Sequence, residues 1–109
     1  DFSILKKIIR TLTDEIDHKV LLPMKNPKLG FRVEGGQRLV DYFGQHTYTF
    51  PLVDCAMMPI ENTTAEMIAQ YFAHRTREEL VTMGIKNLTA IEMEVEESFG
   101  QSATYRLAL

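Results

Sequence analysis

The sequence predicts an α+β domain in which two amphipathic helices cover one face of an antiparallel β-sheet. Two stretches place apolar residues at helical spacing, and short β-rich runs with glycine-containing turns lie between and after them. The runs do not alternate strictly as strand, helix, strand, which argues against a parallel sheet of βαβ units. The chain has 109 residues and is 45% apolar, so we expect residues 1–109 to form a single domain with its own core.

The first helix is predicted over residues 1–18, with Asp1 in position to cap its N-terminus. Its apolar side chains recur at helical spacing and leave the charged ones on the opposite face; they are Leu5, Ile8, Ile9, Leu12 and Ile16. The second helix begins near Thr63 and Glu66, whose spacing is that of a capping box, and stops at Gly84.

The strands are predicted from alternation and from turns. Residues 30–51 indicate a three-stranded meander with tight turns at Gly35-Gly36 and at Gly44-Gln45. Residues 88–109 indicate two further strands joined around Gly100, and the first of these has Ile91, Met93 and Val95 on one face.

Composition excludes several classes of function. The formal charge of −3 results from 12 basic and 15 acidic residues that are mixed along the chain, which argues against nucleic-acid binding. No apolar run approaches the roughly 18 residues of a membrane span, and no signal peptide is evident. Cys55 is the single cysteine, so no internal disulfide is possible. We therefore expect a cytoplasmic protein with no nucleic-acid or membrane partner.

Glu97 is the first candidate for a functional residue. If the strand keeps its period of two, Glu92, Glu94 and Glu96 face solvent, whereas Glu97 continues the apolar row. A carboxylate on the core side needs donors from the protein or from a ligand. The alternative is that the strand ends at Glu96 and that Glu97 is a solvated turn residue.

Asp17 and His18 are the second candidate, because they are adjacent where the first helical pattern ends. Neighbouring residues on a continuous helix diverge by about 100°, so the side chains can meet only if the helix stops there. A hydrogen bond from Asp17 would then fix the tautomer of His18 and raise its basicity, as a general base requires. Alternatively, His18 caps the negative end of the helix and Asp17 is a surface residue.

The other reactive residue types give weaker signals. Cys55 lies in an apolar stretch and is interpreted as a small core residue rather than a nucleophile. His46 and His74 have no partner at metal-ligand spacing, so neither predicts a zinc site.

Four segments, in order, resemble blocks of the 6-pyruvoyl-tetrahydropterin synthase family, which includes 6-carboxytetrahydropterin synthases. The segments are "DFSILKKII", "EIDHKVLL", "NTTAEMIA" and "VEESFGQSATY". The resemblance implies a T-fold, an antiparallel sheet with two helices on one face, whose subunits assemble as a homo-oligomer, by resemblance a hexamer, with sites at subunit interfaces. Residues 24–58 look like an inserted hairpin region found in longer members.

The resemblance also implies roles for individual residues. His18 takes part in proton transfer at the substrate side chain, and Asp17 orients it. Glu97 anchors the pterin ring by accepting hydrogen bonds from its ring N–H and amino group. Thr63, Thr64 and Glu66 match the segment that lines the pterin pocket.

The implied function is that of a lyase that acts on 7,8-dihydroneopterin triphosphate and eliminates triphosphate, with either a pyruvoyl or a carboxy pterin as product. The family also binds zinc through histidines that precede the Asp-Phe block. Those ligands are not in this sequence, which leads us to expect an N-terminally truncated chain that alone binds no zinc. The alternative is a non-catalytic T-fold protein that has lost the zinc site and serves in pterin binding or assembly.

Overall fold

The computed structural model describes residues 2–96 and 100–109, which form two compact units. The first unit combines residues 1–14 with residues 64–109, and the second comprises residues 15–63. The predicted insertion at residues 24–58 falls within the second unit. Asp1, the predicted N-cap, and Glu97 lie outside the described residues. The single domain over residues 1–109 stays a prediction.

Helix α1 spans Phe2–Ile16, close to the predicted range, and ends two residues before His18. Its side chains follow the predicted amphipathic pattern, because Ile8 and Leu12 are buried while Lys6 and Lys7 are exposed. A cavity of about 100 Å³ between α1 and the second helix is lined in part by Ile8 and Leu12. The apolar stripe therefore packs helix on helix within the first unit.

Helix α2 spans Ala65–Thr82, and its N-cap is Thr64 rather than Thr63. The Oγ1 atom of Thr64 accepts a hydrogen bond from the backbone N–H of Met67 at 3.3 Å. The predicted capping box between Thr63 and Glu66 was therefore wrong by one residue. Glu66 instead lies in the first turn, where a carboxylate complements the positive end of the helix dipole.

The C-terminus of α2 confirms the predicted stop at Gly84, which has a positive φ of 73°. The backbone N–H groups of Gly84 and Ile85 donate to the carbonyls of Val81 and Leu80, both at 3.0 Å. These two bonds form a Schellman motif, in which the residue after the helix adopts the left-handed conformation that glycine allows without a steric penalty.

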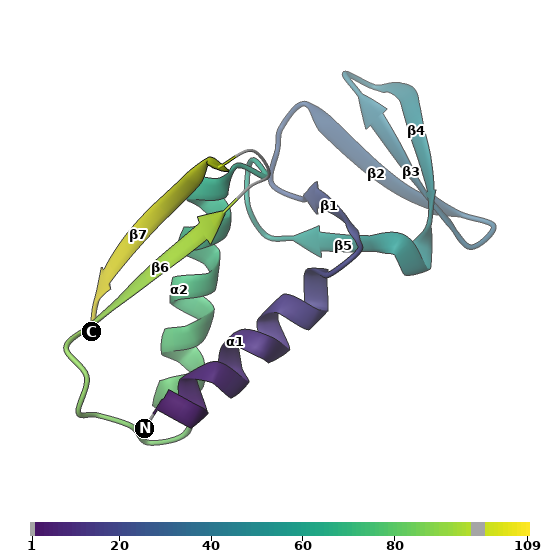
Figure 1. Cartoon of the computed structure of the whole chain (residues 1–109). Helices are drawn as coiled ribbons and strands as arrows, with labels where there is room; N and C mark the ends of the chain where they lie inside the picture. Colours follow the sequence, from purple (N-terminus) through teal and green to yellow (C-terminus); the bar gives the residue numbers. More distant parts are fainter. Residues whose placement is uncertain (1, 97–99) are drawn as a thin grey trace. The chain divides into compact units, whose positions relative to one another are not determined.

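Strands β6 (Ala90–Glu96) and β7 (Ser102–Ala108) form the predicted antiparallel hairpin. Ile91 and Met93 are buried and Val95 is half-buried, whereas the intervening glutamates are exposed. Figure 1 shows α2 running along these two strands in the first unit. The period of two is therefore confirmed as far as Glu96, the last described residue of β6.

The second unit contains the predicted meander, formed by β2 (Leu29–Glu34), β3 (Gln37–Tyr42) and β4 (Gln45–Pro51) (Figure 1). The first turn is at Gly35-Gly36, as predicted. The second is at Phe43-Gly44 rather than Gly44-Gln45, with φ angles of 49° and 78°. Two positive φ angles are those of a type I′ turn, which matches the twist of the flanking strands.

The structure adds a parallel strand pair that the sequence analysis missed. Strand β1 (Val20–Pro23) pairs with β5 (Cys55–Met58), and a 3₁₀ turn, η1 (Leu52–Asp54), precedes β5. Cys55 thus begins a strand, where its half-buried thiol lies 3.5 Å from the carbonyl oxygen of Pro51. Two four-residue strands are too short for a period to be read, and the turns of the meander separate them in sequence.

Two α-helices and antiparallel sheets, all in the described part of the chain, confirm the predicted α+β class. Over those same residues, no helix is both long enough and apolar enough to cross a bilayer.

Candidate substrate-binding and catalytic residues

Asp17 and His18 come together at the turn that ends α1. His18 has a positive φ of 56°, and the backbone N–H of Lys19 donates to the carbonyl of Ile16 at 3.2 Å. This turn brings Nε2 of His18 to 3.7 Å from Oδ2 of Asp17. The distance is that of an ion pair and is too long for the predicted hydrogen bond.

The Asp17–His18 pair is open to solvent. The side chain of His18 is 93% exposed and that of Asp17 is 58% exposed. An exposed ion pair adds little to stability. A left-handed conformation at a residue other than glycine is uncommon, and it carries a small energetic cost. The turn holds the imidazole out where a ligand or another chain can reach it.

Thr63, Thr64 and Glu66 lie at the start of α2. Thr63 is half-buried, whereas Thr64 and Glu66 are exposed. The hydroxyl oxygen of Thr64 accepts the capping bond, which leaves its O–H free to donate to a ligand. Glu66 supplies a carboxylate one turn into the helix. These side chains can therefore present both a donor and an acceptor to a polar heterocycle.

Glu97 lies outside the described residues, but the strand that leads to it is described. In Figure 1, α2 begins and β6 ends at the same end of the first unit. Ser102, at the start of β7, pairs with Glu96, the last described residue of β6. The role predicted for Glu97 stays a prediction.

Within the second unit, the chain enters β1 from Asp17–His18 and leaves β5 towards Thr63, at the opposite end of the β1–β5 pair. The strands are parallel, with Val20 opposite Cys55 and Pro23 opposite Met58. His18 precedes the first of these pairs, and Thr63 follows the last. The paired region alone is roughly 10 Å long, at about 3.3 Å per residue. The strand pair therefore does not bring His18 and Thr63 of one chain together.

The described residues do not supply a zinc site. No group of three or more His, Cys, Asp or Glu side chains that could hold a metal ion occurs among them. The three histidines have other neighbours, because His18 lies beside Asp17, His46 beside Thr49, and the ring of His74 beside that of Tyr105 at 5.9 Å between centroids. Among the described residues, none of these histidines is grouped with the further ligands that a zinc ion requires.

A polar network on the meander was not predicted from the sequence. Nε and Nη2 of Arg32 donate to Oδ2 and Oδ1 of Asp41 at 2.9 and 3.0 Å. Glu34 lies 3.5 Å from the same guanidinium. On β4, His46 places Nδ1 3.8 Å from Oδ1 of Asp41, and its Nε2 lies 3.0 Å from Oγ1 of Thr49. Strand alternation could have placed Arg32 and Asp41 on one face, but it could not have placed His46 there.

The guanidinium sets the charge state of this network. Its hydrogen bonds and positive charge hold the pKa of Asp41 below the usual value, and the pKa of Arg32 is raised in return. Asp41 is therefore ionised at neutral pH, although its side chain is only 16% exposed.

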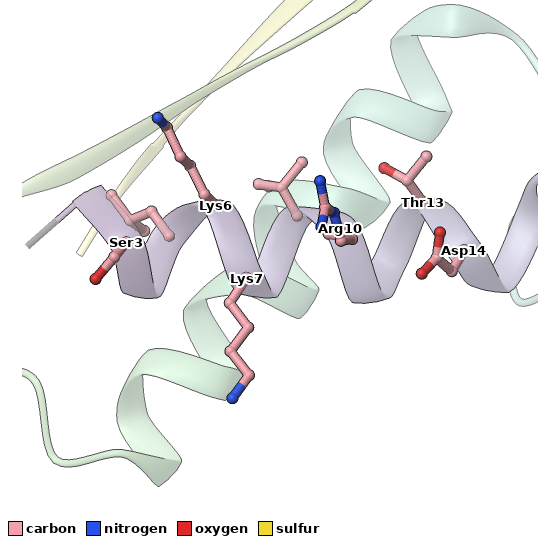
Figure 2. A pocket seen from close by; sticks show the side chains of 8 residues that line it. Ser3, Lys6, Lys7, Arg10, Thr13 and Asp14 are labelled. Carbon is pink, nitrogen blue, oxygen red and sulfur yellow. The ribbon is translucent and has the colours of Figure 1, made fainter.

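A groove of about 790 Å³ runs along α1 (Figure 2). Leu5 and Ile9 line it together with the cationic side chains of Lys6, Lys7 and Arg10. Figure 2 shows Lys6 and Lys7 extending from the helix in opposite directions. None of the residues predicted to bind or transform a substrate lines this groove.

The fold and the candidate side chains are those of a known family. The two helices and antiparallel sheets agree with the T-fold class that the family resemblance implies. The family model for 6-pyruvoyl tetrahydropterin synthase matches residues 1–108, and the chain belongs to this family.

Individual relatives agree with the family match. The chain is 36% identical over 106 residues to a protein of Methanocaldococcus jannaschii that is provisionally named a 6-carboxy-5,6,7,8-tetrahydropterin synthase. The fold of this chain matches the crystal structure of 6-pyruvoyl tetrahydropterin synthase from Plasmodium vivax with a TM-score of 0.89 and 30% identity. The structure of the Plasmodium falciparum enzyme matches with a TM-score of 0.88 and 29% identity.

The matches cover a larger share of this chain than of its relatives. The alignment covers 97% of this chain but 64% of the archaeal protein, and both Plasmodium matches cover 100% of this chain and 68% of the other. The chain thus spans about two-thirds of the length of each of these relatives.

Proposed function

We propose that the chain belongs to a pterin-forming lyase that acts on 7,8-dihydroneopterin triphosphate and releases triphosphate. The family match over residues 1–108 and the synthases among the relatives support this proposal. The product is either the 6-pyruvoyl or the 6-carboxy pterin, since relatives of both kinds match. The non-catalytic alternative is not favoured by these relatives.

The single observation that carries the proposed chemistry is the turn at Asp17–His18. It holds an accessible imidazole 3.7 Å from a carboxylate. A neutral imidazole accepts a proton near neutral pH, and a neighbouring carboxylate stabilises the imidazolium that forms. His18 accordingly takes a proton from a carbon of the substrate side chain, and the electron pair left on that carbon supports the rearrangement and the loss of triphosphate. Asp17, at 3.7 Å, is close enough to stabilise the charge of the imidazolium, and it would orient the ring only if the two side chains approach to hydrogen-bond distance.

Recognition of the pterin is assigned to Thr63, Thr64, Glu66 and Glu97. The free O–H of Thr64 donates to a ring acceptor, and the carboxylate of Glu97 accepts from the ring N–H and the exocyclic amino group. A planar donor pair facing one carboxylate provides two parallel charge-assisted hydrogen bonds.

We further propose that a complete site combines residues of two chains. Within one chain, His18 and Thr63 leave opposite ends of the β1–β5 pair. A pterin bound beside Thr63 of one chain would then contact His18 of another chain. The proposal therefore requires a homo-oligomer, and the family resemblance suggests a hexamer.

The test is an assay of the natural full-length protein with 7,8-dihydroneopterin triphosphate, in which triphosphate release and pterin products are both measured. We expect His18→Gln to lower the turnover number by about 10² to 10⁴, the usual contribution of a positioned general base. Lys19→Gln changes the exposed neighbouring residue and should leave turnover unchanged. Wild-type turnover in the His18→Gln variant would reject the assigned role of His18.

A further inference from the structure

The meander carries a hydroxyl, an imidazole, a carboxylate and a guanidinium in hydrogen-bond or ion-pair contact. They belong to Thr49 and His46 on β4, Asp41 on β3 and Arg32 on β2. The links measure 3.0 Å from Thr49 Oγ1 to His46 Nε2, 3.8 Å from His46 Nδ1 to Asp41 Oδ1, and 2.9 Å from Asp41 Oδ2 to Arg32 Nε. Hydroxyl nucleophiles are activated in such arrangements: a base lies within hydrogen-bond reach of the hydroxyl, and a third group orients the base.

A β-bulge creates this arrangement. In a regular strand, His46 and Thr49 would point to opposite faces, because they are three positions apart. The pairing of β3 with β4 shifts between Val40 and Asp41, so that His46 lies opposite Asp41 while Thr49 lies opposite Leu39. Asp41 and Leu39 share a face of β3, and the extra residue on β4 therefore brings His46 and Thr49 to that same face.

The charge of Asp41 favours one tautomer of His46. Asp41 stays ionised because two guanidinium hydrogen bonds stabilise its carboxylate. A carboxylate beside Nδ1 favours the tautomer with its proton on that nitrogen, which leaves the lone pair of Nε2 facing Thr49. In this tautomer the O–H of Thr49 donates to Nε2. Arg32 and Glu34 are the other charged groups of the network, and their 3.5 Å contact partly offsets the charge of the guanidinium.

We propose that Thr49 is a site of covalent acylation, at which the hydroxyl attacks activated acyl donors such as aryl esters. The Oγ1 of Thr49 forms a bond to the acyl carbon while Nε2 of His46 takes the hydroxyl proton. The bond to the leaving alcohol then breaks, and His46 returns the proton to that alcohol. The product is an ester on Thr49, and no oxidant, metal or cofactor is needed.

The open surface suits this role. Thr49 is exposed, and the side chain of His46 is about half exposed, so a donor can approach from solution. Modification of one residue by an activated donor requires an accessible, activated nucleophile, whereas efficient turnover of unactivated esters would also require oxyanion donors. The inference extends beyond the proposed lyase function and does not depend on it, because none of these four residues is assigned to the pterin site.

The chain provides a matched internal control at Thr47. Thr47 is also an exposed threonine of β4, but its hydroxyl donates to the backbone carbonyl of Gln45 at 3.0 Å. Both hydroxyls are on one peptide, so one mass-spectrometric measurement compares them under identical conditions. Any difference between them reports the local environment rather than the donor.

The experiment incubates the full chain with p-nitrophenyl acetate and follows acetyl occupancy at Thr49 and Thr47 by peptide fragmentation. We expect Thr49 to be acetylated at least about tenfold faster than Thr47, a modest share of what general-base assistance can provide. In the His46→Gln variant the two rates should become similar, and Asp41→Asn should give an intermediate rate at Thr49.

Three outcomes would overturn the proposal. They are equal rates at Thr49 and Thr47 in the wild-type chain, an unchanged rate at Thr49 in the His46→Gln variant, and a stable acetyl group on His46 in place of Thr49. Circular dichroism of each variant shows whether the meander is retained. A variant that loses it is replaced by His46→Asn, which shortens the side chain and also lacks the basic nitrogen.

Discussion

Arg32 and Asp41 form a two-point ion pair across neighbouring strands of the meander, with Nε to Oδ2 at 2.9 Å and Nη2 to Oδ1 at 3.0 Å. Leu39 is the direct cross-strand partner of Arg32, so the guanidinium reaches diagonally to Asp41. Parallel bonds of this kind fix geometry as well as charge. The pair thus ties β2 to β3 on the face that also carries His46.

This ion pair predicts how stability depends on pH. The folded chain holds the pKa of Asp41 below its ordinary value of 3.8, so the ionised carboxylate favours the folded state. The stabilisation is complete above the pKa of the unfolded chain and is lost as the pH falls through the lower pKa of the folded chain. Thermal unfolding between about pH 2 and pH 6 should show a smaller acid-induced decrease in Tm for Asp41→Asn than for the wild type. Asp54→Asn alters an exposed carboxylate of η1, and an identical effect of that change would contradict the assignment.

The helix cap at Thr64 gives a second prediction. Thr64→Ala removes the acceptor for the Met67 N–H and should lower the free energy of unfolding by about 1 kcal/mol. Thr63→Ala, one residue earlier, removes no cap and serves as the control. Urea unfolding of the two variants measures the difference. A larger decrease in the free energy of unfolding for Thr63→Ala than for Thr64→Ala would place the cap at Thr63, as expected from the sequence.

Sharing of the site between chains gives a third prediction. His18→Gln and Glu97→Gln should each reduce activity when expressed alone. If His18 and Glu97 of one site come from different chains, random co-assembly of the two variants restores about a quarter of the sites. Triphosphate release by co-expressed variants measures this fraction. If co-expression restores no activity in assembled protein, the two residues of a site belong to one chain.

The parts of the fold predicted from the sequence have strong local patterns. Helical spacing predicted α1 and α2, and Gly84 marked the end of α2, because only a left-handed residue completes a Schellman motif there. Alternation predicted the buried row of Ile91 and Met93. In each case the determining interactions lie within one element or between sequence neighbours.

The features that were missed depend on distant or irregular pairing. The β1–β5 pair joins residues on either side of the meander, and no local period predicts such a partner. The second turn was placed one residue late because Gly44 can take the left-handed conformation alone, whereas the structure also places Phe43 there. The bulge that brings His46 beside Asp41 breaks the period on which strand analysis depends. At the candidate site, the roles of the segments containing Asp17–His18 and Thr64 stay predictions, and the cap position and the contact distance required the structure.

The central claim, a pterin held by a carboxylate that follows β6, is tested most directly by calorimetric titration of a pterin such as biopterin into Glu97→Gln and Glu96→Gln variants of the natural full-length protein. Glutamine keeps the shape of Glu97 but turns one acceptor into a donor that faces a ligand N–H. The expected cost is about 2 to 4 kcal/mol, a roughly thirty-fold to thousand-fold loss of affinity. Glu96 is exposed at the end of β6, so its variant should bind like the wild type. Equal affinities for the two variants would contradict the proposed pterin site.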